Sequence, residues 1–317
     1  MSMETKNTLG QKRKIWTKNR VQLFIMAICG VAFLFVFAYI PMFGVVLAFK
    51  DGDKELNILN TIVAGEWVGF ENFERFFSDY NFKNIMLNTI GLNLLMLCIN
   101  FPAPILFALM INEVRHKTYQ RTIQSIAIFP TFLSWVVYGG ILLSLMDMNM
   151  GILNPMLRFL GVIGEDEFIN FGEPRFAWAT ISISSILKGT GWASVIYTAA
   201  ILGIDRELFE AATLDGAGRF RQITAITLPS IAPMITVSLL LSISGLLNNS
   251  FEHINVFQNA INKSKSEVIA TYVYSQGISG RLYSYTTAVG LFQSLVALVL
   301  LIISNFISKK TTGRGLY

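Results

Sequence analysis

Residues 206–233 read RELFEAATLDGAGRFRQITAITLPSIAP, a polar stretch that leads directly into an apolar one. Near its start, four residues have the i, i+3, i+4, i+7 spacing of one helix face: Leu208, Ala211, Ala212 and Asp215. Gly216 follows, and glycine tolerates the positive φ of a sharp turn. A second helix is predicted from near Gly218 into the apolar stretch, with Pro229 and Pro233 in its path. The segment therefore predicts a helix–turn–helix that leads into a long apolar helix.

The first of these two helices has small side chains where a lipid-surface helix would have bulky ones. A helix that rests on lipid usually combines bulky apolar residues with a lysine-rich polar face. Here the adjacent residues Ala211 and Ala212 follow an acid, Glu210. Small residues let the backbone of another protein approach closely. Resting on lipid is the alternative, but these residues favour docking of a short projecting helix into a groove of a partner protein.

The rest of the chain is dominated by long uncharged stretches. Of its 317 residues, 53% are hydrophobic and 14% are charged, whereas a soluble domain carries about 25% charged residues. Six segments reach the roughly 20 residues that a helix needs to cross a bilayer. They are 21–49, 84–111, 122–146, 176–202, 226–247 and 285–308. Because they lack the short alternating pattern of a barrel, the sequence predicts an all-α integral membrane protein with about six transmembrane helices.

The basic residues gather in the segments that this topology places on one side of the membrane. With both termini in the cytoplasm, the cytoplasmic segments hold 15 Lys and Arg, and the outside segments hold 9. An excess of Lys and Arg in cytoplasmic segments is the positive-inside pattern. The first span follows six of these basic residues and is interpreted as an uncleaved helix. The positive net charge thus reflects topology and gives no reason to expect a nucleic-acid partner.

The stretch quoted first also matches a known motif. Residues 210–229, EAATLDGAGRFRQITAITLP, resemble the EAA motif of binding-protein-dependent ABC importer permeases, which usually reads EAAxxDGAxxxxxFxxIxLP. Nine positions agree: Glu210, Ala211, Ala212, Asp215, Gly216, Ala217, Ile226, Leu228 and Pro229. Ile223 stands where Phe is commonest in the motif. The first and fourth spans are similar to the carbohydrate-uptake branch of the family, in particular to LplB-like polysaccharide permeases.

The resemblance implies a type I ABC importer permease (MetI-like) fold, in which residues 206–229 form a cytoplasmic coupling helix. In the family this helix sits in a cleft of an ATPase subunit. The residues that would couple ATP hydrolysis to transport are Glu210, Ala211, Ala212, Asp215, Gly216, Ala217, Leu228 and Pro229. The implied partners are a second permease subunit, usually a different chain, two ATPase subunits, an extracytoplasmic solute-binding protein and a carbohydrate substrate. ATP and Mg would be used by the ATPase subunits, and we expect this chain to bind no cofactor or metal.

The resemblance also implies a multi-pass location in the bacterial cytoplasmic membrane. We expect residues 1–20 to form a basic cytoplasmic segment and residues 309–317 a cytoplasmic tail. Residues 21–308 between them would form one six-helix transmembrane permease domain. Two outside segments, 51–83 and 147–175, are predicted to form short helices on the outer surface.

Three alternatives compete with a permease for oligosaccharides or polysaccharide fragments. The same architecture could import a non-sugar small solute, such as an amino acid or a phosphonate. A secondary transporter would work without ATP, but internal repeats and broken membrane helices, which are typical of that class, are not evident. A membrane enzyme would need a catalytic constellation, and no HExxH, GxSxG or GxxxxGK[ST] pattern occurs. We therefore expect a transport subunit and not an enzyme.

One charged residue lies inside a predicted span. Lys188 lies about 18 Å into the fourth span, near mid-bilayer, where an ionisable residue is a functional-site candidate. Ser184, Lys188 and Trp192 recur every fourth residue and share a polar and aromatic face that suits a glycan path. A neighbouring stripe of small residues suits close helix packing: Ser185, Gly189 and Ala193. The alternative is that Lys188 pairs with a carboxylate or a backbone carbonyl and only fixes packing.

The last candidates lie in the outside segment 248–284. Asn248 and Asn249 are candidates for the solute path. Other polar and aromatic residues of this segment, His253 among them, could contact the binding protein or the entering solute. An ordinary solvated loop is the alternative interpretation of the whole segment.

Overall fold

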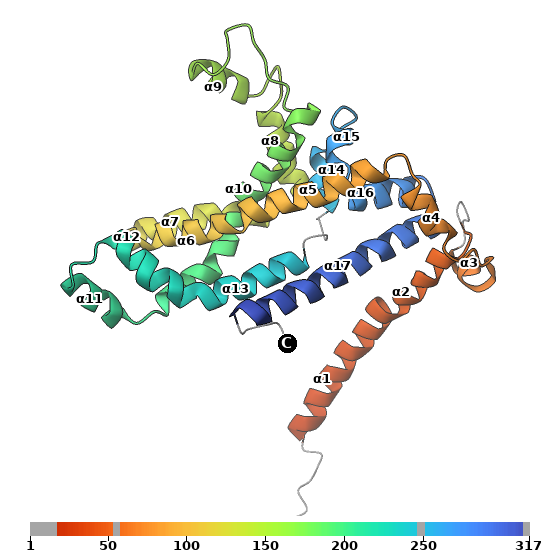
Figure 1. Cartoon of the computed structure of the whole chain (residues 1–317), viewed down its shortest axis with the longest axis horizontal. Coiled ribbons are helices and arrows are strands. Elements are labelled where there is room, and N and C mark those ends of the chain that lie inside the picture. Colours follow the sequence, from red (N-terminus) through yellow and green to blue (C-terminus); the bar gives the residue numbers. More distant parts are fainter. Residues whose placement is uncertain (1–17, 53–57, 246–250, 313–317) are drawn as a thin grey trace, which may run out of the picture.

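The computed structural model describes residues 18–52, 58–245 and 251–312, and every named element in these ranges is a helix. Figure 1 shows several long helices that run in a similar direction, with short helices gathered at their ends. Among the described residues, the predicted all-α fold is confirmed.

Four continuous helical segments are long and apolar enough to cross a membrane: Gln22–Phe49, Phe82–Asn112, Arg219–Ile243 and Tyr283–Phe306. A fifth consists of two helices joined at a sharp bend, Lys117–Phe132 and Trp135–Leu145. Helix α10 (Pro174–Leu202) has 29 residues and the length to cross, but it is not among the described segments that are both long and apolar enough. These segments correspond in order to the six predicted spans, with small differences at their ends.

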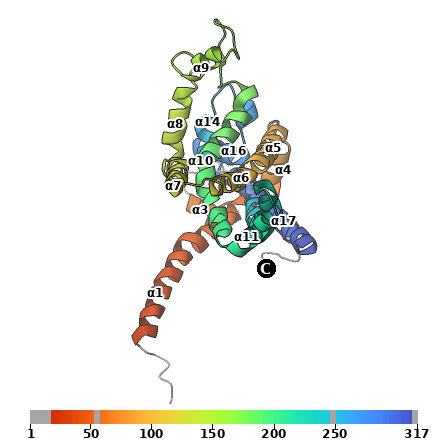
Figure 2. The same ribbon diagram turned by 90° about the vertical axis from the view of Figure 1, so that its left-hand side faces the viewer.

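The first of these segments stands apart from the bundle. It comprises α1 (Lys18–Leu34), a π-helical turn (Phe35–Tyr39), α2 (Ile40–Met42) and a 3₁₀ stretch η2 (Phe43–Phe49). Figure 2 shows α1 leaving the side of the bundle. Its apolar side chains are exposed over nearly the whole length, and only η2 packs against the bundle, on α17 (Tyr283–Thr312).

The prediction of one continuous third span is wrong. Helix α7 (Lys117–Ile128) passes into a 3₁₀ turn, η3 (Phe129–Phe132), and α8 (Trp135–Leu145) then leaves at an angle of 106°. Pro130 has no N–H to continue the helix. Leu133 and Ser134 have extended backbones, and Ser134 Oγ accepts a hydrogen bond from Val137 N (3.2 Å), which starts α8 as a new helix.

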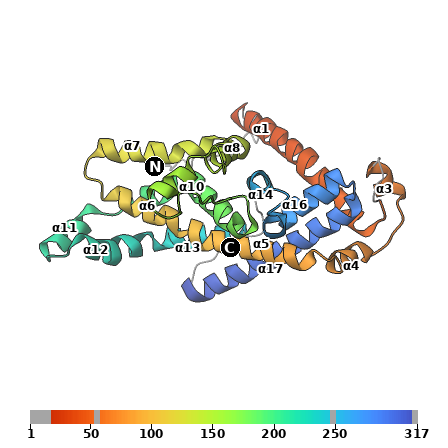
Figure 3. The same cartoon turned by 90° about the horizontal axis from the view of Figure 1, so that it is seen from above.

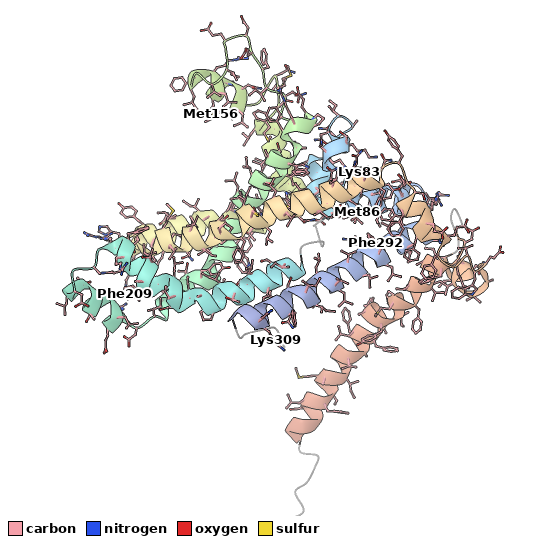
Figure 4. The ribbon with its side chains drawn as sticks, viewed as in Figure 1. Lys83, Met86, Met156, Phe209, Phe292 and Lys309 are labelled. Atoms are coloured by element: carbon pink, nitrogen blue, oxygen red, sulfur yellow. The ribbon has the colours of Figure 1, made fainter. Side chains whose placement is uncertain are left out.

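Three hydrophobic clusters among the described residues hold the helices together, and two of them lie mainly between long helices. In one, α5 (Phe82–Asn100) and α17 meet α4 (Glu71–Phe77) around Phe76 and Tyr285. Figure 4 shows Met86 of α5 and Phe292 of α17 facing each other, and both pack against this cluster. In the other, α6 (Pro102–Asn112), α10 and α13 (Leu228–Ser244) meet around Tyr197. Helix α10 thus lies against several elements of the bundle.

The segment after α13 is not an ordinary solvated loop in its described part. Residues 251–279 form α14 (Phe251–Phe257), α15 (Lys263–Ser266), α16 (Ile269–Tyr274) and a π-helical turn η5 (Ser275–Ser279). Ile254 and Val268 are 0% exposed. The short helices pack against α5, α8 and α10, so apolar burial folds this segment into the bundle.

Short helices lie at the two ends of the long axis, as Figures 1 and 3 both show. At one end are α11 (Arg206–Leu214) and α12 (Arg219–Gln222), which continues through a π-helical turn η4 (Ile223–Thr227) into α13. At the other end are α3 (Ile58–Ala64) and α4. Helix α9 (Leu153–Phe159) lies on a projection beyond α8. Short helices are confirmed in both segments where the sequence predicts them.

Candidate functional site

The α11–α12 hairpin, residues Arg206–Gln222, turns at Gly216. This glycine has a φ of +78°, in the left-handed region that glycine adopts without steric cost. Ala217 N donates to Ala212 O (2.8 Å), and Gly216 N donates to Thr213 O (3.1 Å). These two bonds close the end of α11 in the way that a glycine after a helix allows. The turn predicted at Gly216 is therefore confirmed, and α12 begins at Arg219, next to Gly218, as predicted.

Side-chain contacts hold the hairpin in one shape. Gln222 Nε2 donates to Thr213 Oγ1 and to Ala217 O, both at 3.0 Å, and so joins α12 to α11. Arg219 Nη1 lies 3.4 Å from Glu113 Oε2, which joins the hairpin to the loop between α6 and α7. These contacts join the two helices of the hairpin to each other and to the end of α6.

Most of the hairpin's outer surface is free of contacts with the rest of the chain. Helix α11 has no buried residue, and Leu214 and Phe220 are 89% and 80% exposed. Phe209, which Figure 4 labels at this end of the molecule, is half-buried, and so is Ala212. The other motif residues of the turn are exposed or half-buried: Glu210, Ala211, Asp215, Gly216 and Ala217. Leu228 packs against the cluster around Tyr197, and Pro229 stands in the first turn of α13.

A cavity of about 440 Å³, here called the central cavity, lies among α5, α6, α8, α10, α13 and α14. Its polar lining consists of amides and hydroxyls: Asn93, Asn100, Ser185, Ser238 and Ser242. Its aromatic lining consists of Phe101, Trp135, Tyr197 and His253. The described residues that line it include no Lys, Arg, Asp or Glu. Such a lining suits a ligand that carries many hydroxyl groups and also has apolar faces.

Lys188 lies behind this cavity, and its ammonium group is directed at the break between α7 and α8. Lys188 is 7% exposed. Its Nζ donates to the carbonyl oxygens of Pro130 (2.9 Å), Thr131 (3.2 Å) and Leu133 (2.6 Å). The Pro130 carbonyl also accepts a hydrogen bond from Leu133 N (3.3 Å), and the carbonyls of Thr131 and Leu133 lie where the helix ends and leaves such groups without helical partners. These contacts match the alternative interpretation, in which Lys188 pairs with backbone carbonyls. Lys188 does not line the central cavity.

The structure separates the three residues that the sequence places on one face of α10. Ser184 is 1% exposed and, like Lys188, lies inside the bundle, whereas Trp192 is 60% exposed. Asn248 and Asn249 lie outside the described residues.

The stripe of small residues on α10 also has a different role from the one predicted. Ser185 and Ala193 line the central cavity, and a Cβ on Gly189 would meet nothing within 4 Å. The close approach of another helix occurs at Gly191, where a Cβ would fall 2.0 Å from the carbonyl oxygen of Ala127. The predicted close packing at the stripe is wrong, because α7 crosses α10 on another face.

Sequence reasoning does not single out Trp135, and it places His253 only among possible loop contacts. In the structure their rings stack with centroids 3.9 Å apart and planes inclined by 20°. His253 Nε2 also lies 3.0 Å from Ser184 Oγ. The two rings come from α8 and α14, which are far apart in the chain, so no local pattern could pair them.

Comparisons with known proteins agree over almost the whole chain. The sequence profile of a family described as binding-protein-dependent transport system inner membrane component matches residues 9–313. Protein LplB of Bacillus subtilis (strain 168) is 39% identical over 296 residues, which are 93% of this chain and 91% of the relative. The polygalacturonan/rhamnogalacturonan transport system permease protein YteP of the same organism is 39% identical over 297 residues, 93% and 90% of the two chains.

A solved structure gives the same result for the fold. It is a bacterial alginate ABC transporter in complex with an alginate pentasaccharide-bound periplasmic protein. One of its chains superimposes with a TM-score of 0.83 at 33% identity, over 94% of this chain and 98% of that chain.

Proposed function

This chain belongs to the family of binding-protein-dependent transport system inner membrane components, the permeases of ABC importers, and we propose that it passes oligosaccharides or polysaccharide fragments. As a permease component it is a transport subunit and not an enzyme. The cargo is supported by similarity to a polygalacturonan/rhamnogalacturonan permease and to an alginate transporter.

The central cavity is the observation that carries this proposal. A saccharide offers hydroxyl groups together with flat apolar ring faces, and the cavity offers amides, hydroxyls and aromatic rings. We propose that the cavity forms this chain's part of the solute path. Asn248 and Asn249 follow the cavity-lining Gly245 in sequence and stay candidates for the same path, as does the exposed Trp192. Ser184 and Lys188 would act from behind the cavity wall.

The α11–α12 hairpin is proposed to dock in a groove of an ATPase subunit. Its exposed surface combines small residues with the apolar side chains of Leu214 and Phe220, which would lose contact with water on docking. The residues proposed to couple ATP hydrolysis to transport are Glu210, Ala211, Ala212, Asp215, Gly216, Ala217, Leu228 and Pro229. Closure of the ATPases would then move the hairpin and, through it, α13.

The remaining parts of the importer are proposed from the family. They are a second permease subunit, usually a different chain, two ATPase subunits that use ATP and Mg, and an extracytoplasmic solute-binding protein. The positive-inside pattern supports cytoplasmic termini, with the basic residues 1–20 and the tail 309–317 on the side of the ATPases. Residues 21–308 would form the permease domain in the bacterial cytoplasmic membrane.

The proposal is tested by reconstituting this chain in proteoliposomes with the second permease, ATPase and binding protein from the same organism. The panel of solutes contains short oligosaccharides of galacturonan, rhamnogalacturonan, alginate, arabinan and chitin. We expect at least one of them to stimulate ATP hydrolysis and to be taken up only when the binding protein is present. Stimulation by amino acids alone would contradict the cargo, and uptake that needs no ATP would favour a secondary transporter.

Two variants of α10 test whether the central cavity is the path. Ala193→Trp places an indole in the cavity lining and should abolish uptake. Leu187→Trp places the same ring on the outward side of the same helix, where Leu187 is 56% exposed, and should leave uptake unchanged. Normal uptake by the Ala193 variant would exclude the central cavity as the path.

A further inference from the structure

We propose that Trp135 and His253 form a saccharide-binding wall of the central cavity and that Lys188 is the residue that positions this wall. In this wall, His253 Nδ1 accepts a hydrogen bond from a sugar hydroxyl. The inference rests on the proposed function, because it assigns ligand contacts within the same cavity.

The hydrogen bonds of His253 determine which ring nitrogen is free. Its Nε2 lies 3.1 Å from the carbonyl oxygen of Ile181 and 3.0 Å from Ser184 Oγ. A carbonyl oxygen only accepts, so Nε2 must carry the proton. His253 is 4% exposed, and the Lys188 ammonium lies near the same Trp135 ring on which the imidazole stacks. Burial and the nearby positive charge both disfavour a second proton on the imidazole.

Nδ1 is therefore an acceptor, and it has no hydrogen-bond partner among the described residues. His253 lines the central cavity. Its Nε2 is bound to α10, so Nδ1 is the polar atom that this side chain can offer to a ligand. A sugar hydroxyl is a donor of suitable size for this acceptor.

Trp135 supports His253 from the other element of the wall. The two rings stack at 3.9 Å, so the position of the imidazole depends on that of the indole. Lys188 Nζ lies 5.2 Å from the centre of the Trp135 ring and 5.5 Å from that of Tyr138, within the range of cation–π attraction. Tyr138 OH in turn donates to Ser184 O (3.1 Å). The first turn of α8 is thus fastened to α10.

Lys188 also fixes the point at which α8 begins. Its three bonds satisfy the carbonyls of the break, and Thr131 Oγ1 donates back to Lys188 O at 2.8 Å. Without the ammonium, the carbonyls of Thr131 and Leu133 would lose this partner in a poorly hydrated region, which is costly. The break would then relax, and Trp135 would no longer be held against His253. Lys188 thus acts through Trp135 and not by touching the solute.

The test measures uptake kinetics of the complete reconstituted importer with the panel oligosaccharide that stimulates it most. His253→Gln keeps an amide donor for Ile181 O but has no acceptor at the Nδ1 position. His253→Phe keeps a ring for the stack on Trp135 but has no nitrogen. We expect each to raise the KM for uptake by about 3- to 10-fold, the effect of losing one hydrogen bond.

Lys188 is tested by a conservative and a non-conservative substitution. Lys188→Met removes the ammonium and should raise KM by a similar factor. Lys188→Arg keeps a charged donor and should have a KM close to that of the unsubstituted protein. The double variant of Lys188→Met with His253→Gln should raise KM less than the product of the two single effects, since both act on one contact.

Lys50 provides a matched control. Lys50 is 4% exposed, donates to Ile62 O (2.8 Å) at the end of α3, and lies 5.3 Å from the ring of Trp67. It has the same chemistry as Lys188 but does not line or touch the central cavity. Lys50→Met should leave KM unchanged.

The outcomes separate this inference from the proposed function. Unchanged KM in both His253 variants, with uptake abolished by Ala193→Trp, would overturn the wall and leave the solute path in place. Normal uptake by Ala193→Trp, or a panel without any stimulating oligosaccharide, would overturn both. A Lys188→Met variant that loses only yield or maximal rate, with KM unchanged, would overturn the positioning role.

Discussion

Gly191 of α10 lies directly against the backbone of Ala127 in α7. A Cβ at Gly191 would fall 2.0 Å from the Ala127 carbonyl oxygen and 2.7 Å from the nitrogen of Ile128. This crossing lies just ahead of the break between α7 and α8. Lys188, one helical turn before Gly191 on α10, binds carbonyls of that break. The broken span is therefore fixed to α10 by a backbone contact and by a lysine side chain.

Gly191→Ala should destabilise the protein, because the added methyl group has no space between the two backbones. Overpacking of this kind costs about 1–3 kcal/mol. We expect a lower midpoint of thermal unfolding in detergent. Gly189→Ala, on the same helix, adds the same methyl group where nothing lies within 4 Å, and should not lower the midpoint. Equal midpoints for the two variants would show that α7 and α10 do not approach in this way.

Gly216→Pro should leave membrane insertion intact but uncouple ATP hydrolysis from uptake. Proline fixes φ near −65°, whereas Gly216 has a φ of +78°, so the end of α11 cannot keep its hydrogen bonds. Gly218→Ala is the control, since Gly218 has a φ of −70° and open space around it. The measurements are the yield of assembled transporter, ATPase activity and uptake. Coupled transport by the Gly216 variant would contradict the role of the hairpin.

Glu210→Lys should also uncouple hydrolysis from uptake, because it reverses a charge on the surface proposed to dock. Glu210 is exposed, so its replacement should change folding by well under about 1 kcal/mol. Glu207→Lys makes the same change one turn earlier on α11 and lies outside the motif. We expect the Glu207 variant to keep a larger share of coupled uptake. The docking surface would be placed wrongly if the two variants behaved alike.

Glu267 should make the stability depend on pH. Burial raises the pKa of this carboxyl above its ordinary value of 4.5, and Lys263, 3.3 Å away, partly opposes that shift. A raised pKa means that the charged form is disfavoured in the folded state, so Glu267 costs stability above its folded pKa. The cost disappears below the pKa of the unfolded chain, where the group is neutral in both states.

Glu267→Gln is therefore expected to raise the unfolding midpoint by about 1–2 °C near neutral pH. The gain should shrink as the pH falls from the raised folded-state pKa towards 4.5. Glu165→Gln, on an exposed loop, serves as the control. A gain that grows on acidification would have the wrong sign for a carboxyl with a raised pKa.

The long apolar segments and the hairpin could be predicted from the sequence because each depends on local properties. The length of an apolar run decides whether a helix can cross a bilayer, and neighbouring residues alone set that length. The turn at Gly216 follows from the φ that this one residue can adopt. The motif from Glu210 to Pro229 is contiguous, so it too can be read without a structure.

The break in the third span shows where local information ends. Pro130 alone does not decide it, since Pro233 lies inside α13 and that helix continues. The break at Pro130 differs from the continuous helix at Pro233 because the Lys188 ammonium binds carbonyls at the break. Lys188 lies 55 residues from Leu133 in the chain. Trp135 and His253 are also far apart in the chain, so local sequence patterns cannot predict that their rings stack.

The sequence by itself thus determined that the chain crosses a membrane several times and carries a projecting, glycine-turned hairpin. Only the tertiary structure decided which buried groups face the central cavity and which serve the packing behind it. The physical reason is that a backbone carbonyl freed from a helix, or a ring nitrogen without a local partner, is satisfied by whatever group the fold brings to it. For Leu133 that group is Lys188, and for His253 Nε2 it is the backbone of Ile181.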